Sequence, residues 1–320
     1  MGGMKGFMPP FLKPFRLERI WLAKMNVVTE ERYLPWALLA PTLFIILLIG
    51  IFPLFYNLYL SLHFWNLTRP DLGMRFIWFK NYIALFSSSI FWGAFFRTIV
   101  FTLVAVGIEM CLGFGLALMF NRDFKGKAVV FPLVLIPMIT TPIVVGLIWR
   151  YMYNGEFGFV SWILQELGVN VHALLSNPTT ALPAVIFVDI WHWTPFVFLL
   201  SLARLNSLPR SPYEAAEIDG ASTWQTFKWI TFPMMKSVLL VALLLRTMDA
   251  FKIFDEIFIM TQGGPGDATE MLSLEVYRQT FRYFNMGKGS ALAIVMLIVI
   301  ILISRIYLKV FQKQQTAAEG

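Results

Sequence analysis

Six long apolar runs constrain the fold of this chain more than any other feature of its sequence. They lie near Trp36–Leu60, Ala94–Phe120, Ala128–Arg150, Pro183–Leu205, Lys236–Met260 and Gly289–Leu308. Only 14% of the 320 residues are charged, whereas soluble domains carry about 25%. A helix crosses a bilayer with roughly 17–25 residues, so the sequence predicts an all-α fold, a polytopic membrane bundle of about six transmembrane helices.

The basic residues indicate how this bundle is oriented. Sixteen lysines and arginines lie in the two terminal segments and in the connections after the second and fourth runs, against six in the other connections. Basic residues favour the cytoplasmic side of a membrane. We therefore expect a multi-pass protein of the plasma (inner) membrane with both termini in the cytoplasm. The net charge of +7 then reflects topology rather than nucleic-acid binding.

Six spans leave little chain for a separate soluble domain. The expected division is a basic cytoplasmic segment at residues 1–34, a transmembrane domain at 35–309 and a cytoplasmic tail at 310–320. The first segment could contain a basic interfacial helix at Phe15–Met25 or an unordered tail. A polar insert at 206–235, between the fourth and fifth runs, is expected on the cytoplasmic side.

This polar insert carries the local signals of two short helices. The first helix would begin at a capping box with a favoured proline, formed by Ser211, Pro212 and Glu214. Gly220, after Asp219, can take the left-handed conformation that ends a helix. Ser222 and Gln225 then form a second capping box. We expect two helices about a tight glycine turn, and we call residues 211–235 the elbow.

Three interpretations of the elbow compete on physical grounds. It could be an ordinary helical loop, a DNA-binding helix-turn-helix, or a docking site for a cytoplasmic protein. The helix-turn-helix is disfavoured because the elbow lacks a third helix and a basic recognition face, and because membrane spans hold both its ends.

The residue spacing in the elbow resembles the EAA loop of importer-type ABC permeases. The pattern is "EAA", three residues, glycine, nine residues and "I-x-F-P", and it is carried here by Glu214, Ala215, Ala216, Gly220, Ile230 and Pro233. Phe232 stands where leucine is usual. The stretches "LNSLPRSPYEAAEIDGAS" and "FDEIFIMTQGGPGDATE" are similar to the carbohydrate branch of that family, of the maltose and glycerol-phosphate type.

The resemblance implies a transport subunit rather than an enzyme, moving a sugar or sugar-like solute by alternating access. ATP and Mg²⁺ would be bound by a partner ATPase, since the chain has no GxxxxGK[ST] phosphate loop. The implied partners are a second homologous permease, two ATPase copies, an extracytoplasmic sugar-binding protein and membrane lipid. The implied ATPase-coupling residues are Glu214, Ala215, Ala216, Asp219, Gly220, Ile230 and Pro233. No cofactor or metal is expected in the chain itself.

Charged residues concentrate in the fifth run, at Arg246, Asp249, Lys252, Asp255 and Glu256. Charges at membrane depth cost several kcal/mol unless they are paired or wet. On one continuous helix, Lys252 could pair with Asp249 or Glu256. In the fourth run, Asp189 and His192 are one turn apart and could hydrogen-bond to each other.

These seven polar residues support different interpretations. They could form a buried, self-neutralising charge ladder, or they could line the path of a sugar, with carboxylates accepting hydrogen bonds from hydroxyl groups. A proton relay is a third interpretation, and with it comes the alternative function, an ion-coupled secondary transporter that uses the charged fifth span. The three scattered histidines do not suggest a metal site.

Two further features lie on the extracytoplasmic side. Thr261–Gly266, "TQGGPG", is either a simple turn or, as the resemblance implies, a contact surface for the binding protein. Glu270–Phe284 is expected to form a short surface helix.

The third run contains three prolines, Pro132, Pro137 and Pro142. They predict either a simple kink or a flexible wall of the translocation path.

Overall fold

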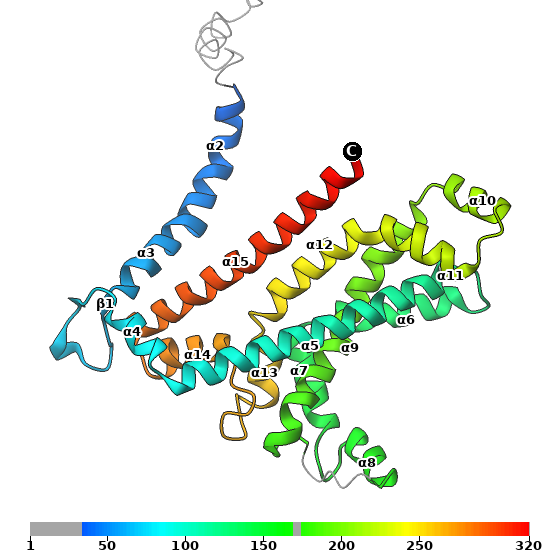
Figure 1. The fold of residues 1–320 in the computed structure, drawn as a ribbon. Coiled ribbons are helices and arrows are strands. Elements are labelled where there is room, and N and C mark those ends of the chain that lie inside the picture. The colour runs from blue at the N-terminus through cyan, green and yellow to red at the C-terminus, as the bar shows by residue number, and fades with distance from the viewer. Residues whose placement is uncertain (1–33, 169–173, 320) are drawn as a thin grey trace, which may run out of the picture. The chain divides into compact units, whose positions relative to one another are not determined.

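The structure, a computed structural model, describes residues 34–168 and 174–319 and is almost entirely helical (Figure 1). The all-α prediction is confirmed, while the interfacial helix considered at Phe15–Met25 lies outside the described residues. The chain forms two units, residues 1–57 and 58–320. In the described part of the first unit, α2 (Leu34–Ile46) continues through the π-helical turn η1 (Leu47–Ile51) into α3 (Phe52–Ser61), whose last turn belongs to the second unit.

The second unit contains the remaining elements. A small antiparallel sheet pairs β1 (His63–Phe64) with β2 (Arg75–Phe76), His63 facing Phe76, around the 3₁₀ turn η2 (Pro70–Leu72). The helices that follow are α4 (Lys80–Phe86), α5 (Ser89–Phe120), α6 (Lys127–Ile139), α7 (Pro142–Met152), α8 (Phe159–Glu166), α9 (Pro178–Asn206), α10 (Ser211–Ile218), α11 (Thr223–Thr226), η3 (Phe227–Thr231), α12 (Phe232–Ala250), α13 (Asp255–Met260), α14 (Leu272–Tyr277), η4 (Arg278–Arg282) and α15 (Met286–Glu319).

Four helical segments of the described chain are long and apolar enough to cross a membrane alone. They are Leu34–Ser61, Ser89–Phe120, Pro178–Asn206 and Met286–Lys309. These correspond to the first, second, fourth and sixth predicted runs.

The third predicted run is a broken helix. α6 and α7 are bent by 101° at a short break, and together they make a fifth candidate span. Thr140 and Thr141 are extended at the break. The proline that follows explains the angles of Thr141, because Pro142 disfavours helical angles at the residue before it.

The fifth run is not one continuous helix, and that prediction is wrong. α12 ends at Ala250 and α13 begins at Asp255. Between them the chain makes a turn in which Phe251 keeps helical angles; Phe251 and Ile253 are buried and Lys252 is exposed. Phe251 and Ile253 belong to two different hydrophobic clusters, and the turn lets the chain contribute a side chain to each.

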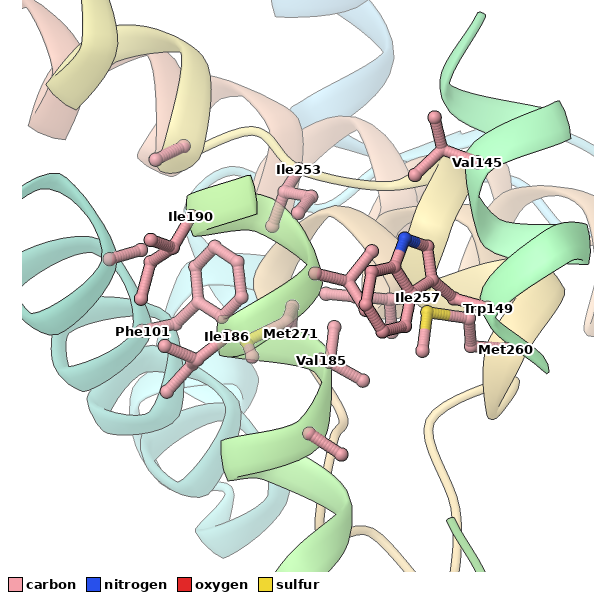
Figure 2. Close-up of a cluster of buried hydrophobic side chains, with 14 of the residues drawn as sticks. Phe101, Val145, Trp149, Val185, Ile186, Ile190, Ile253, Ile257, Met260 and Met271 are labelled. Atoms are coloured by element: carbon pink, nitrogen blue, oxygen red, sulfur yellow. The ribbon is translucent and has the colours of Figure 1, made fainter. Parts of the chain in front are cut away.

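The core of the second unit is built around α5 and α9, which run side by side (Figure 1). Gly113 permits their close approach, because a Cβ atom there would lie 2.6 Å from the Val197 side chain. One hydrophobic cluster joins these two helices to α7 and α13. Figure 2 shows Trp149 of α7 beside Ile257 and Met260 of α13.

The predicted surface helix at Glu270–Phe284 needs correction. Its structured part is α14 followed by η4, and Leu272 and Leu274 are fully buried. Phe281 is exposed, at 64%. The segment therefore packs against the bundle, and only its later part lies at the surface.

Candidate functional site

The elbow folds about its glycine as the local signals predict. Gly220 has φ +68°, in the left-handed region where glycine is favoured. Ser222 begins α11 with a complete capping box: the Gln225 amide donates to Ser222 Oγ over 3.4 Å, and the Ser222 amide donates to Gln225 Oε1 over 2.7 Å. The glycine turn and the second capping box are confirmed.

The first capping box is absent, and that prediction is wrong. Arg210 precedes α10 with helical angles, and no side chain caps it. Its carbonyl accepts the amides of Tyr213 and Glu214. The helix thus starts one residue earlier than a serine cap requires, which places Ser211 inside it. Glu214 is exposed and does not cap its own helix.

Contacts inside the elbow stabilise it, while other side chains of the elbow are exposed. Tyr213 Oη donates to Thr231 Oγ1 over 3.1 Å, and Ala216 is buried. The residues of the EAA pattern that are exposed are Glu214, Ala215, Gly220 and Pro233, together with the adjacent Asp219, whereas Ile230 is half-buried. Ile218 is 86% exposed, and Trp224 and Trp229 are 67% and 70% exposed. Large apolar side chains exposed in a polar segment mark an interaction surface.

A second polar constellation surrounds Arg246, which is 1% exposed. Its guanidinium makes a bidentate pair with Glu109 of α5, at 2.7 Å and 3.0 Å. It also donates to Asp189 of α9 at 3.0 Å and to Asp249 at 2.9 Å. The Trp193 ring lies 4.8 Å from the guanidinium carbon. Arg246 thus joins α5, α9 and α12 through charge-assisted hydrogen bonds, which are among the strongest in proteins.

Five of the seven predicted path residues line one cavity of about 330 Å³ at the break between α12 and α13. They are Asp189, Asp249, Lys252, Asp255 and Glu256. The cavity is also lined by Pro142 and Trp193. The other two, His192 and Arg246, are not among its lining residues and are buried, each 1% exposed.

Two predicted pairings are wrong because the polar side chains reach across helices. Asp189 and His192 do not bond to each other: Asp189 accepts from Arg246, while His192 Nδ1 lies 2.9 Å from Glu256 Oε1. Lys252 pairs with Asp249 at 3.6 Å, as one of the two expected pairings predicts. It does not pair with Glu256, because the helix that would align them is broken.

Glu109 is the site residue that the sequence analysis missed. It is fully buried in the second span, within "VGIEMCLG". A lone carboxylate in an apolar span is itself a signal, since an intramembrane charge needs a partner. The described residues contain no group of three or more His, Cys, Asp or Glu side chains that could hold a metal ion.

The "TQGGPG" segment and the residues that follow it, up to Glu270, are held in place by two arginines. Arg97 of α5 donates to the carbonyl of Glu270 over 3.1 Å and to Asp267 over 3.0 Å. Arg278 of η4 lies 2.9 Å from the carboxylate of Glu270 and donates to the carbonyl of Gln262. Gly263, at φ +90°, lies directly against the Glu270 carboxylate and leaves no room for a Cβ atom. The segment is therefore a loop held by tertiary contacts rather than an unsupported turn.

Glu270 predicts a pH dependence of this loop. Burial is the main cause that raises the pKa of its carboxyl from 4.5 to about 7, although Arg278 acts in the opposite direction. Between pH 4.5 and about pH 7, the Glu270 carboxyl is protonated more fully in the folded state than in the unfolded chain. The free energy of unfolding therefore falls as the pH rises through this range. We expect the loop amides to be better protected from hydrogen exchange at about pH 5 than at about pH 8, after correction for intrinsic rates. Glu270→Gln should remove the difference, and a difference that persists would contradict the assignment.

Comparison with known proteins places these features in context. The family model for the binding-protein-dependent transport system inner membrane component matches residues 109–316. The trehalose/maltose transport system permease protein MalF of Thermococcus litoralis is 39% identical over 284 residues, covering 88% of this chain and 94% of that protein. The sulfoquinovosyl glycerol transport system permease protein SmoG of Agrobacterium fabrum is 35% identical over 282 residues, covering 88% and 91%.

Among solved structures, this chain is similar to one of a bacterial ABC transporter involved in the import of the acidic polysaccharide alginate. The TM-score is 0.77 at 22% identity, with 92% of this chain and 99% of that chain covered. At that level of identity the likeness shows a shared fold.

Proposed function

This chain belongs to the family of binding-protein-dependent transport system inner membrane components, and we propose that it forms part of the membrane path of an ATP-driven importer of a sugar. The family membership confirms the resemblance first drawn from the elbow. It also makes the chain a transport component rather than an enzyme. The observation that carries the proposal is the exposed EAA-type elbow built about Gly220.

The elbow is proposed to be the dock for a separate ATPase that binds ATP and Mg²⁺. α10 has no side-chain cap, and the capping box of α11 is worth about 1 kcal/mol, so these two short helices would gain rigidity by packing against a partner. Their exposed apolar side chains supply the surface for that contact. The residues proposed to transmit the movement are Glu214, Ala215, Ala216, Asp219, Gly220, Ile230 and Pro233.

The coupling route follows from the chain connections. The elbow joins the end of α9 to the start of α12. A rigid-body movement of the ATPase would therefore move both helices, and with them the cavity that Asp189 and Asp249 line. In Figure 1, α10 and α11 lie at one end of α5 and α9, and α8 lies beyond the opposite end of α9.

The cavity at the α12–α13 break is proposed to contact the sugar in transit. Its carboxylates can accept hydrogen bonds from sugar hydroxyl groups, and Lys252 can donate to them. A sugar substrate is supported by the relatives, which are permeases for trehalose/maltose and for sulfoquinovosyl glycerol. His192 and Arg246 do not line the cavity, so they would position the residues that do rather than contact the sugar.

The proposed assembly contains a second homologous permease, two ATPase copies and an extracytoplasmic sugar-binding protein. The elbow and both termini would face the cytoplasm, as the distribution of basic residues favours. The loop at Thr261–Gly266 is proposed to face the binding protein, and Arg278 holds it in place through the carbonyl of Gln262. The division into a basic segment at 1–34, a membrane domain at 35–309 and a tail at 310–320 belongs to the same proposal.

The ion-coupled secondary transporter is not supported. The family model describes components of binding-protein-dependent transport systems. The charges of the fifth predicted run suggested that alternative, and pairs across helices account for them. Arg246 pairs with Glu109 and Asp189, and Glu256 pairs with His192.

Reconstitution with its partner subunits tests the proposed function. The assembled complex, in vesicles with ATP inside and binding protein outside, should accumulate radiolabelled trehalose or maltose only when ATP is present. Dissipating the proton and sodium gradients should leave uptake unchanged. If neither sugar is taken up, mass spectrometry of the small molecule held by the binding protein should identify another sugar. Uptake that needs an ion gradient and not ATP would overturn the proposal.

A further inference from the structure

Two of the predicted apolar runs are broken, and they meet in the interior of the second unit. The third run breaks between α6 and α7, and the fifth run breaks between α12 and α13. The halves beyond the breaks, α7 and α13, pack against each other (Figure 2). Gly146 allows this contact, because a Cβ atom there would lie 3.2 Å from Ile259 and 3.3 Å from the backbone of Glu256. Arg150 adds a hydrogen bond of 3.0 Å to the carbonyl of Ile259.

The α7–α13 pair is therefore closely packed, and the two connections that lead into it, from α6 and from α12, are both non-helical. Trp149 contributes to the joint, since it is buried in the cluster that contains Ile257 and Met260. Helix interruptions are where a membrane protein can absorb changes in backbone angles. The cavity that includes Pro142 and Asp255 lies at both breaks, so a movement of the pair would reshape it.

One side chain of α9 spans both breaks. His192 Nε2 lies 3.1 Å from the carbonyl oxygen of Thr140, which the α6–α7 break leaves without a helical partner. Its Nδ1 lies 2.9 Å from Glu256 Oε1, at the start of α13. His192 is 1% exposed and Glu256 is 4% exposed, so water does not compete for these contacts.

The chemistry of the two partners fixes the protons in this bridge. A carbonyl oxygen only accepts, so Nε2 must carry a hydrogen. The contact with Glu256 then needs one proton, either on Nδ1 facing a carboxylate or on the carboxyl group facing an unprotonated Nδ1. In both arrangements the pair is neutral overall, as its buried position requires. Asp189 and Arg246, which lie on α9 and α12, pair with each other and not with this bridge.

We infer that the α7–α13 pair moves as one body during transport and that His192 is the positioning residue that fastens it to α9 in the conformation seen here. This inference rests on the proposed function, in which the cavity opens to alternate sides of the membrane. It gives His192 a role separate from sugar contact, in keeping with its place behind the cavity wall. The pair also contacts α9 through the rings of Trp149, Phe187 and Trp191 and through Tyr153, which donates to the carbonyl of Ala184. Release of either His192 hydrogen bond would therefore loosen the pair at its two breaks without detaching it from α9.

Spin-label distances between α7 and α9 test the inference directly. Labels would be placed at Ile148 and Leu199, which are 45% and 37% exposed, after replacing the exposed Cys111 with alanine. The full-length chain would be copurified with its partner subunits and measured in nanodiscs without nucleotide. We expect one distance in the parent and, in His192→Phe, a second population above the roughly 10% that marks a minor state.

Three further variants separate the bridge from a general loss of packing. Glu256→Leu removes one arm of the bridge and should also produce the second population. Glu256→Gln should retain the single distance, because its amide can donate to Nδ1 while Nε2 still donates to Thr140. His63→Phe is the matched control: His63 is also buried and bonds to a backbone carbonyl, but it lies on β1, away from both breaks. It too should retain one distance.

The outcomes are decisive in either direction. A single unchanged distance in assembled His192→Phe, or in Glu256→Leu should His192→Phe fail to assemble, would overturn the inference. A second population in His63→Phe would overturn it as well, since the effect would not belong to the bridge. These distances do not depend on uptake. Parent complex that fails to import sugar with ATP would contradict the proposed function alone.

Discussion

Gly220→Val is expected to abolish ATP-driven uptake while leaving the chain inserted in the membrane and assembled with its partner permease. Gly220 has φ +68°, and a β-branched residue at such an angle is a genuine conformational outlier. The expected strain is about 1–3 kcal/mol. No atom lies within 4 Å of the added Cβ, so the effect arises from the backbone angle and not from a clash.

The strain would be relieved by turning α10 relative to α11. Such a turn would separate Ala215 and Asp219, before the glycine, from Ile230 and Pro233, after it. The proposed ATPase dock depends on their relative placement. The spans themselves would be unaffected, because Gly220 is exposed and touches neither α5 nor α9. Uptake of radiolabelled sugar into vesicles and the amount of inserted chain are the two measurements.

Gly126→Val is the matched control for Gly220→Val. Gly126 has φ +89°, also faces open space and also lies in a connection proposed to be cytoplasmic, but it is outside the elbow. It carries similar strain and should retain most of the uptake. Unchanged uptake in Gly220→Val, or equal loss in both variants, would argue that the glycine turn is not the coupling element.

The elbow was predictable because its signals are local. A serine and a glutamine three residues apart close the Ser222–Gln225 capping box without help from the rest of the chain. The left-handed angle of Gly220 is likewise a property of the turn. Ser211 was predicted less well, since its role depended on whether Arg210 was already helical, and flanking sequence does not decide that.

The polar constellation was harder to predict because its partners are distant in sequence. Local spacing pairs Asp189 with His192, but the structure pairs Asp189 with Arg246, 57 positions away, and His192 with Glu256, 64 positions away. A buried charge takes whichever opposite charge the packing of helices brings to it. The α12–α13 break was missed for a related reason: it follows from the burial of Phe251 and Ile253 in different clusters, which is tertiary information.

Arg246→Met is expected to destabilise the bundle by about 3–5 kcal/mol, the range for breaking a buried ion pair by removing one partner. Arg246 neutralises and hydrogen-bonds the carboxylates of Glu109, Asp189 and Asp249. Methionine fills similar space but leaves Glu109 and Asp189, both almost fully buried, facing each other without a counter-charge. The free energy of unfolding, measured by titration with a denaturing detergent, and the yield of assembled complex should both fall.

Lys252→Met is the matched control in the same span. Lys252 also pairs with Asp249, but at 3.6 Å, and the two side chains are 60% and 43% exposed. An exposed pair contributes little, so its loss should change stability by about 0.5 kcal/mol or less.

A compensated variant separates charge from packing. Arg246→Met combined with Glu109→Gln and Asp189→Asn removes the buried negative charges together with the cation, and it should recover much of the lost stability, because a buried amide costs far less than a buried carboxylate without a counter-charge. Recovery would show that Arg246 matters as a counter-charge for two spans that could not otherwise bury their carboxylates. If the triple variant were as unstable as Arg246→Met, the lost hydrogen-bond geometry at the junction of α5, α9 and α12 would be the cause instead. If Arg246→Met itself matched Lys252→Met, the constellation would not be what holds these helices together.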